Sequence, residues 1–168
     1  MIPGISSRRR FADLTEQEVL ALAISSEEDD GRIYRSYAES LRTDYPGSAA
    51  VFDGMAAEEN RHRQRLIDLH TSRFGDVIPL IRREHVAGFY ARRPVWLTEN
   101  LGLERIRAEA HGMEQDAAAF YQRAAARTTD AATRRLLGDL AAAEAGHVRL
   151  ADGLEAELLG GDTRAKED

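Results

Sequence analysis

The sequence of 168 residues contains no cysteine. This absence excludes disulfide bonds, thiol catalysis, iron–sulfur clusters and cysteine-ligated zinc ribbons. Aromatic residues are scarce, at 7%, and no apolar run approaches the roughly 18 residues that are needed to cross a bilayer. What is present is 43% hydrophobic and 31% charged residues, a composition typical of one compact, soluble domain with a core of its own.

Positive charge is in deficit, because the net charge is −6 and no basic stripe runs along the chain. A nucleic-acid partner is therefore not expected. One basic run, Ser7–Phe11, resembles a twin-arginine export signal, but Ala12–Glu16 follows it where such a signal requires an apolar segment. We expect residues 1–12 to form a flexible N-terminal arm.

Only four prolines divide the chain, and each marks a place where a helix cannot continue. Thr15 and Glu18 form the capping-box pattern that starts a helix, and Gly75 follows a long helical pattern as its terminator. These signals predict an all-α protein, an antiparallel four-helix bundle over residues 13–160. Its helices are expected at about 15–42, 48–72, 98–127 and 130–159.

The connection between the second and third predicted helices, residues 73–97, is long. Such a crossover carries the chain back along a bundle, and we expect a short helix within it at 77–88. Residues 161–168 follow the fourth helix and are expected to form a polar tail.

The pattern Glu-x-x-His occurs twice, at Glu59–His62 and at Glu144–His147, each time within an otherwise apolar seam. Residues at this spacing face a neighbouring helix. A buried carboxylate is costly unless a proton, a cationic side chain or a metal ion neutralises it. A purely structural bundle would pair these inner charges with arginines.

The first and third helices carry one further carboxylate each, Glu27 and Glu114, and a tyrosine follows each of them by seven residues. The chain is therefore a twofold internal repeat in which each half supplies Glu and then Glu-x-x-His. Four carboxylates and two imidazoles that converge within a bundle are the ligand set of di-iron and di-manganese carboxylate proteins. We assign the glutamates of the two Glu-x-x-His pairs, Glu59 and Glu144, as bridging ligands. The other four residues are assigned as terminal ligands: Glu27, His62, Glu114 and His147.

Five residues near these ligands have both a structural and a functional interpretation: Tyr34, Tyr121, Glu58, His111 and Glu28. The tyrosines are core residues or hydrogen-bond partners of ligand carboxylates. Glu58 is a surface residue or accepts the free N–H of a ligand histidine, although Ala143 stands in its place in the second half. His111 is a packed histidine or an extra ligand, and Glu28 is an exposed residue or recruits metal at an entrance.

Four motifs together resemble those of the rubrerythrin-type members of the ferritin-like superfamily: Ala23–Glu28, Ala56–His62, Met113–Asp116 and Ala141–His147. The resemblance covers about residues 11–160. More narrowly, the sequence is similar to the cytosolic N-terminal domain of the erythrin–vacuolar-iron-transporter proteins, also called membrane-bound ferritins.

This resemblance implies a ferritin-like fold, a di-iron centre with manganese as the alternative metal, and a ferroxidase that takes Fe(II) and dioxygen or peroxide as substrates. It also implies a homodimer, a cytoplasmic location and, in the whole protein, a membrane transport domain that exports iron. The chain is then either an excised domain at the cytosolic face of the inner membrane, with residues 161–168 as a truncated linker, or a stand-alone relative. The implied catalytic and metal-binding residues are Glu27, Glu59, His62, Glu114, Glu144 and His147, with Tyr34, Tyr121 and Glu58 around them.

Two alternative functions use the same site. One is a rubrerythrin-like peroxide reductase, which would need an external electron donor because a chain without cysteine holds no rubredoxin-type iron. The other is an iron-sensing or dimerisation module that binds iron without turnover.

Overall fold

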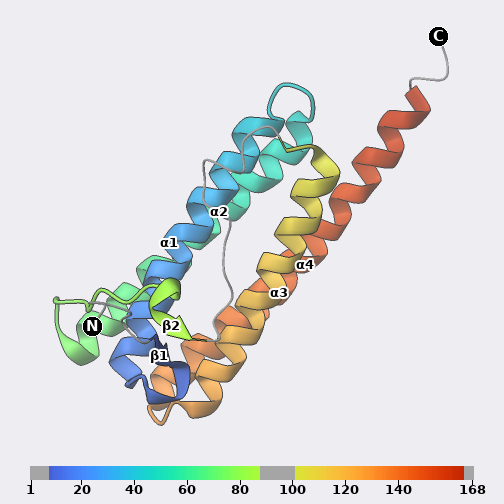
Figure 1. The fold of residues 1–168 in the computed structure, drawn as a ribbon. Coiled ribbons are helices and arrows are strands. Elements are labelled where there is room, and N and C mark those ends of the chain that lie inside the picture. Colours follow the sequence, from blue (N-terminus) through green and yellow to red (C-terminus); the bar gives the residue numbers. More distant parts are fainter. Residues whose placement is uncertain (1–7, 88–100, 165–168) are drawn as a thin grey trace, which may run out of the picture.

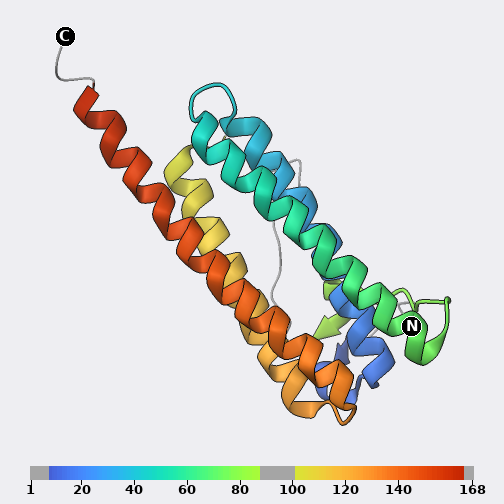
Figure 2. The same ribbon diagram turned by 180° about the vertical axis from the view of Figure 1, so that it is seen from behind.

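The computed structural model describes residues 8–87 and 101–164, with side chains described up to residue 150. Figure 1 shows four long helices packed lengthwise, and Figure 2 shows the same arrangement from behind. They are α1 (Glu16–Leu41), α2 (Pro46–Phe74), α3 (Leu103–Arg127) and α4 (Ala131–Arg164). The predicted all-α, ferritin-like four-helix bundle is confirmed.

The helices form two hairpins, α1 with α2 and α3 with α4, joined by short links at residues 42–45 and 128–130. As Figure 1 shows, α2 and α3 run in the same direction, so the end of α2 and the start of α3 lie at opposite ends of the bundle. The predicted connection between them is therefore a long crossover, of which residues 88–100 lie outside the described residues. Within residues 8–87 and 101–164, no helix is long and apolar enough to span a membrane.

The ends of the first hairpin follow its local sequence signals. Thr15 caps α1, because its hydroxyl accepts a hydrogen bond from the backbone N–H of Glu18 (3.2 Å) and the Glu18 carboxylate accepts one from the Thr15 N–H (3.1 Å). α2 begins at Pro46, two residues earlier than predicted. Proline is favoured at the first helical position, because the backbone N–H that it lacks would have no hydrogen-bond partner there. α2 ends at Phe74, two residues beyond the predicted end, and the predicted terminator Gly75 caps it with a φ of 90°, which favours glycine.

The ends of the second hairpin differ from the prediction. α3 begins at Leu103 because Gly102 has extended backbone, so the predicted helix over 98–102 is wrong at residues 101 and 102, while 98–100 lie outside the described residues. α4 continues to Arg164, five residues beyond the predicted end at 159. Gly160 and Gly161 lie within it, because each helical glycine costs only about 1 kcal/mol. The helix therefore extends into the predicted polar tail, over residues 161–164.

The crossover contains less helix than predicted. Residues 77–87 hold only one 3₁₀ turn, η2 (Arg83–His85), followed by the short strand β2 (Val86–Ala87). Pro79 explains the difference, because it donates no hydrogen bond and disfavours helical backbone at the preceding residue.

Part of the predicted flexible arm is held against the bundle. Strand β1 (Arg9–Arg10) pairs in parallel with β2, and the 3₁₀ turn η1 (Phe11–Asp13) follows it. Phe11 is buried edge-on against Phe120 of α3, and the guanidinium of Arg127 donates to backbone carbonyls of this segment. The prediction of a flexible arm is therefore wrong for residues 9–12.

The crossover is anchored on α1 by a buried ion pair. Arg83 is 5% exposed and donates to Asp30 (2.8 Å) and to the backbone carbonyl of Ser26 (3.0 Å). The neighbouring Arg82 donates to Asp29 at 2.8 Å.

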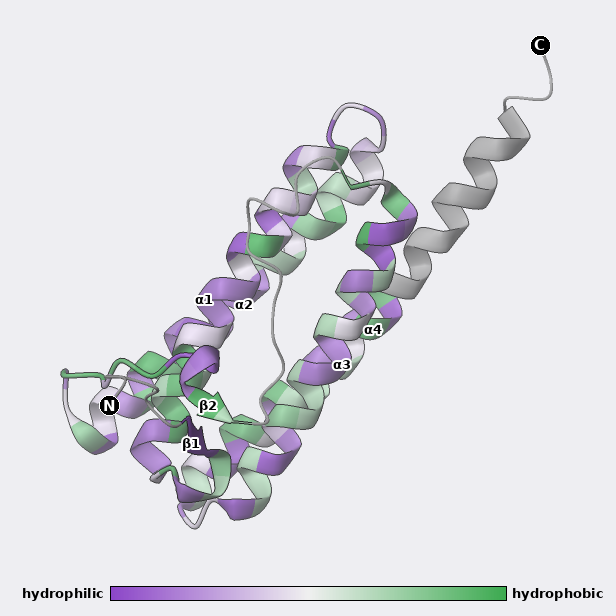
Figure 3. Cartoon of the chain, in the orientation of Figure 1, coloured by the Kyte–Doolittle hydropathy of each residue, from purple (hydrophilic) through white to green (hydrophobic). Residues whose placement is uncertain are grey.

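Two apolar clusters fill the bundle, and both include residues of both hairpins. One contains Leu20, Leu66, Phe120 and Leu140, and the other contains Tyr37, Phe52 and Ile106. Figure 3 shows hydrophilic and apolar residues interleaved along each helix, as expected for helices that bury one face. The buried polar residues treated next lie on these same inward faces.

Candidate metal centre

The six predicted ligands converge from all four helices. Each is at most 5% exposed, and each lies on the inward face of its helix. Glu27 comes from α1, Glu59 and His62 from α2, Glu114 from α3, and Glu144 and His147 from α4.

The ligand atoms form two overlapping groups, and within each group they all lie within 4.8 Å of one another. One group is Glu27, Glu59, His62 and Glu144, and the other is Glu59, Glu114, Glu144 and His147. Glu59 and Glu144 belong to both groups. The geometry is that of two adjacent cation positions, here called the His62 position and the His147 position, which share two carboxylates.

Both histidines direct Nδ1 toward the carboxylates. Nδ1 of His62 lies 3.2 Å from Glu144 Oε1 and 3.6 Å from Glu27 Oε2. Nδ1 of His147 lies 3.2 Å from Glu114 Oε2, and 3.6 and 3.7 Å from Glu144 and Glu59. The two rings are nearly parallel, with centroids 6.0 Å apart.

The electrostatics reflect four carboxylates enclosed with two imidazoles. Burial raises the pKa of Glu59 well above its ordinary value, and the charges of Glu27 and Glu144 raise it further. Burial also raises the pKa of Glu114, with a contribution from Glu144. Burial alone would raise the pKa of Glu144, but its interactions with Glu114 and the two histidines outweigh burial and lower the pKa.

The histidine pKa values rise for the complementary reason. Burial lowers the pKa of His62, but its contacts with Glu144 and Glu27 outweigh burial and raise the pKa to about 9. Contacts with Glu114 and Glu144 likewise outweigh burial and raise the pKa of His147 to about 11. The metal-free cluster therefore holds protons on its two histidines, and their positive charge offsets part of the negative charge of the carboxylates.

The donor set fits divalent metal ions. Four buried atoms of the cluster have no hydrogen-bond partner: Glu27 Oε2, Glu59 Oε1, Glu144 Oε1 and His62 Nδ1. Among the described residues, no arginine pairs with any of the four glutamates, so the arrangement expected of a purely structural bundle is not found there. Unpartnered carboxylate and imidazole atoms that face one another are suited to iron or manganese.

Two tyrosines join the hairpins at the cluster. The Tyr34 hydroxyl of α1 donates to Glu114 of α3, and the Tyr121 hydroxyl of α3 donates to Glu27 of α1. Burial raises the pKa of both tyrosines well above the ordinary value, and the nearby carboxylates raise it further. Both hydroxyls therefore stay protonated and act as donors, which leaves the second oxygen of each carboxylate available for a metal ion.

The other predicted residues lie around the cluster. Glu58 is half-buried and contacts Nε2 of His147 through a carboxylate oxygen. Glu28 forms ion pairs with Arg32 (2.7 Å) and Arg63 (3.9 Å) at the surface. His111 is half-buried and belongs to neither ligand group found among the described residues.

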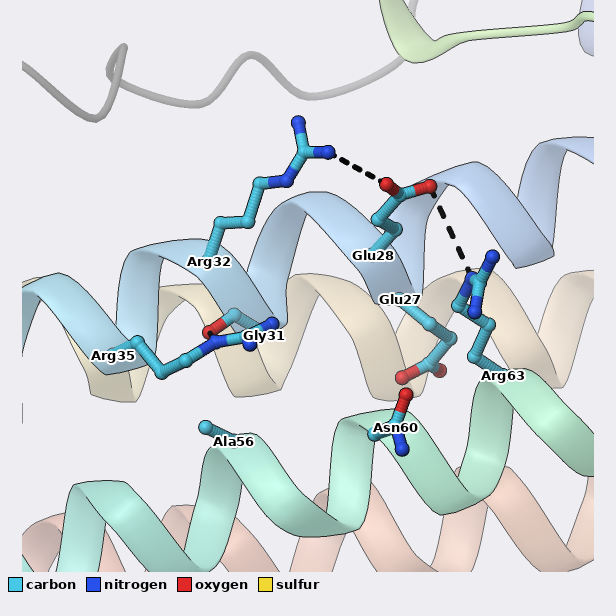
Figure 4. Close-up of a pocket in the computed structure, with 8 residues that line it drawn as sticks. All are labelled: Glu27, Glu28, Gly31, Arg32, Arg35, Ala56, Asn60 and Arg63. Carbon is cyan, nitrogen blue, oxygen red and sulfur yellow. Dashed lines mark hydrogen bonds and ion pairs between the residues drawn. The ribbon is translucent and has the colours of Figure 1, made fainter.

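A pocket of about 250 Å³ lies between α1 and α2 beside Glu27. Figure 4 shows Glu27 pointing into this space toward Asn60, with the side chains of Arg35 and Arg63 on its two sides and that of Arg32 pointing away. These arginines were not predicted from the sequence. The only signal was their position on the same helical faces as Glu28 and Asn60, next to the ligand seam.

Comparison with known proteins agrees with this geometry. The sequence matches the rubrerythrin family over residues 18–155. The fold is similar to that of a hypothetical protein from Pyrococcus furiosus, with a TM-score of 0.70 and 25% identity over 89% of this chain and 94% of that one.

A second structure has a similar fold. It is a protein from Thermotoga maritima described as a ferritin-like diiron-carboxylate protein, with a TM-score of 0.68 and 18% identity over 86% of this chain and 96% of that one. No curated protein sequence matches the chain. Because the family match covers most of the sequence and its ligand pairs meet inside one bundle, the chain belongs to the rubrerythrin family.

Proposed function

We propose that this protein is a di-iron ferroxidase, which binds two Fe(II) ions and oxidises them with dioxygen. The observation that carries the proposal is the pair of ligand groups that share Glu59 and Glu144. Shared carboxylates hold two cations at a short separation, and four glutamates offset the charge of two ferrous ions. Each Fe(II) substrate gives up one electron, and dioxygen accepts both.

The roles of the chain's own residues follow from their contacts. Glu59 and Glu144 are the proposed bridging ligands. The terminal ligands are Glu27 and His62 at one position, and Glu114 and His147 at the other. Tyr34 and Tyr121 hold the terminal carboxylates in place by donating to one oxygen of each. The apolar clusters on both sides keep bulk water away from the ligands other than Glu27, which lines the pocket.

The test is an anaerobic titration with Fe(II), followed by exposure to dioxygen. We expect two Fe(II) bound per chain, and then loss of chelatable Fe(II) together with oxygen uptake. Binding of two ions without oxygen uptake over repeated additions would instead support the iron-sensing module. Peroxide consumption that exceeds oxygen consumption, with a reductase present, would support the peroxide reductase.

Three further parts of the proposal come from the resemblance to the membrane-bound ferritins. They are a homodimer, a cytoplasmic location, and a membrane iron-export domain that this bundle serves. Sedimentation of the purified chain tests the dimer, and fractionation of cells that produce the native protein tests the location and the membrane attachment.

A further inference from the structure

The internal repeat fails at one residue that touches a proposed ligand. Superposing Glu59–His62 on Glu144–His147 along the sequence places Glu58 opposite Ala143. Glu58 of α2 reaches across to α4 and contacts Nε2 of His147. Ala143 offers no such acceptor to His62.

The contact fixes how His147 presents itself to the cluster. When the ring is neutral, as a histidine that binds a metal ion is, a carboxylate at Nε2 keeps the remaining proton on that nitrogen and the lone pair on Nδ1. Nδ1 is the atom that faces Glu114, Glu59 and Glu144. Glu58 therefore holds His147 in the tautomer and orientation that a metal ion needs.

His62 lacks this support. Among the described residues, no side chain hydrogen-bonds its Nε2, and only its Nδ1 faces carboxylates. The Nε2 side of its ring is therefore held by packing alone, and its exposure of 5% is the highest among the six ligands.

The surroundings of Glu27 add a second difference. The pocket between α1 and α2 reaches Glu27, which belongs only to the His62 position. The pocket arginines Arg32, Arg35 and Arg63 correspond in the second half to Ala119, Gln122 and Val148, none of which is charged. Water and small anions that enter this pocket can compete with the protein for an ion beside Glu27 (Figure 4).

We infer that the two ion positions are inequivalent: the His147 position fills first and releases its ion last, because Glu58 positions His147, while the His62 position exchanges its ion more readily. The inference rests on the proposed two-ion centre. Glu58 acts as a positioning residue and does not itself bind the ion.

Titration with Mn(II) alone tests the inference. The electron paramagnetic resonance signal of free Mn(II) measures how much of the ion remains unbound at each addition. The wild-type protein should bind two ions in two resolved steps. Glu58→Ala should weaken the tighter step by about 10- to 100-fold, the usual effect of removing a carboxylate behind a histidine ligand. Glu58→Gln keeps an oxygen that accepts the Nε2 proton, and its affinity should lie closer to wild type.

Single-position backgrounds identify which ion is affected. His62→Ala keeps the His147 position, and there Glu58→Ala should lower Mn(II) affinity. His147→Ala keeps the His62 position, and there Glu58→Ala should have no effect. In that second background, Ala143→Glu supplies the missing acceptor and should raise the affinity. Release of bound Mn(II) into excess chelator should show a fast and a slow phase in the wild type. His62→Ala should show the slow phase alone.

Two equal binding steps in the wild type, or equal weakening of both positions by Glu58→Ala, would overturn the inference and leave the two-ion centre intact. Failure of the wild-type protein to bind Mn(II) or Fe(II) at all would refute the centre itself. The two failures are thus distinguished by the stoichiometry of the wild-type titration.

Discussion

The α1–α2 hairpin and the α3–α4 hairpin supply the same ligand types at the same helical spacing, each with a tyrosine that reaches the other hairpin. Outside those residues they diverge. α1 carries Asp30, which anchors the crossover through Arg83, whereas the corresponding residue of α3 is Ala117. The first hairpin also supplies Glu58 and the pocket arginines, and the second hairpin has uncharged residues at those places.

This comparison distinguishes the residues that a pair of cations requires in both hairpins from the residues that can differ between the hairpins. The inward-facing residues match because each of two adjacent ions needs a similar donor set. Asp30 differs from its counterpart Ala117 because Arg83 of the crossover packs on α1. The predictions below test where the equivalence of the halves ends.

Removal of a shared carboxylate should have the largest effect. Glu59→Ala and Glu144→Ala should each weaken binding of both ions by more than about 100-fold, because each residue belongs to both ligand groups. Glu27→Ala and Glu114→Ala should each impair mainly one ion. Metal analysis after dialysis against Fe(II) or Mn(II) measures the stoichiometry, and Glu39→Ala, at a side chain that is 75% exposed, is the control. A Glu59→Ala protein that still holds two ions would contradict the shared assignment.

The second-largest effect should come from removing the buried ion pair between Arg83 and Asp30, which anchors the crossover on the first hairpin. Arg83→Met should lower the free energy of unfolding by about 3–5 kcal/mol, because it removes the cationic half of a buried ion pair with Asp30. Arg82→Met is the matched control. Arg82 is 34% exposed at its side chain, so its loss should cost at most about 1 kcal/mol. Urea unfolding of the metal-free proteins measures both, and equal effects would show that burial is not the decisive difference.

The two tyrosines should behave alike. Tyr34→Phe and Tyr121→Phe should each destabilise the metal-free protein by about 1–3 kcal/mol, because each leaves a buried carboxylate oxygen without its donor. Tyr37→Phe is the control, since Tyr37 donates at 2.8 Å to Glu109, whose side chain is 22% exposed and can turn to water. Unequal losses for Tyr34 and Tyr121 would extend the inequivalence of the halves to their terminal carboxylates.

The pH dependence should be the most gradual effect. Folding raises the pKa of Glu59, Glu114, His62 and His147, so the folded metal-free protein binds these protons more strongly than the unfolded chain does. Stability should therefore fall as the pH rises, through about 9 for His62 and about 11 for His147. Each proton contributes at most about 1.4 kcal/mol per pH unit.

Thermal unfolding between neutral and alkaline pH measures this loss in chelator-treated protein. His62→Gln should flatten the part of the curve below about pH 9. Mn(II)-loaded protein is the comparison, and its added stability should grow with pH because protons compete with metal for the same atoms. A metal-free protein that gains stability toward alkaline pH would show that the cluster does not hold these protons.

Periodicity and capping were sufficient to predict most of the fold. Thr15 and Gly75 mark helix ends through local hydrogen bonds and backbone conformation, which depend on neighbouring residues alone. The predicted helix at 77–88 and the flexible arm failed for the opposite reason. Val86 and Arg9 are fixed by pairing with each other across 77 positions of sequence, and no local pattern announces such a contact.

The amino-acid sequence by itself determined the ligand types and their inward placement. Helical spacing puts Glu27, Glu59, Glu114 and Glu144 on the apolar faces of their helices, and these are the faces that the bundle buries. Only the tertiary structure decided which residues from different helices contact one another at the site. Glu58 meets His147 of the other hairpin, and Arg63 of α2 lines the pocket at Glu27 of α1, because helix packing brings together residues that are distant in the chain. Those long-range contacts, rather than the repeated motifs, make the two halves different.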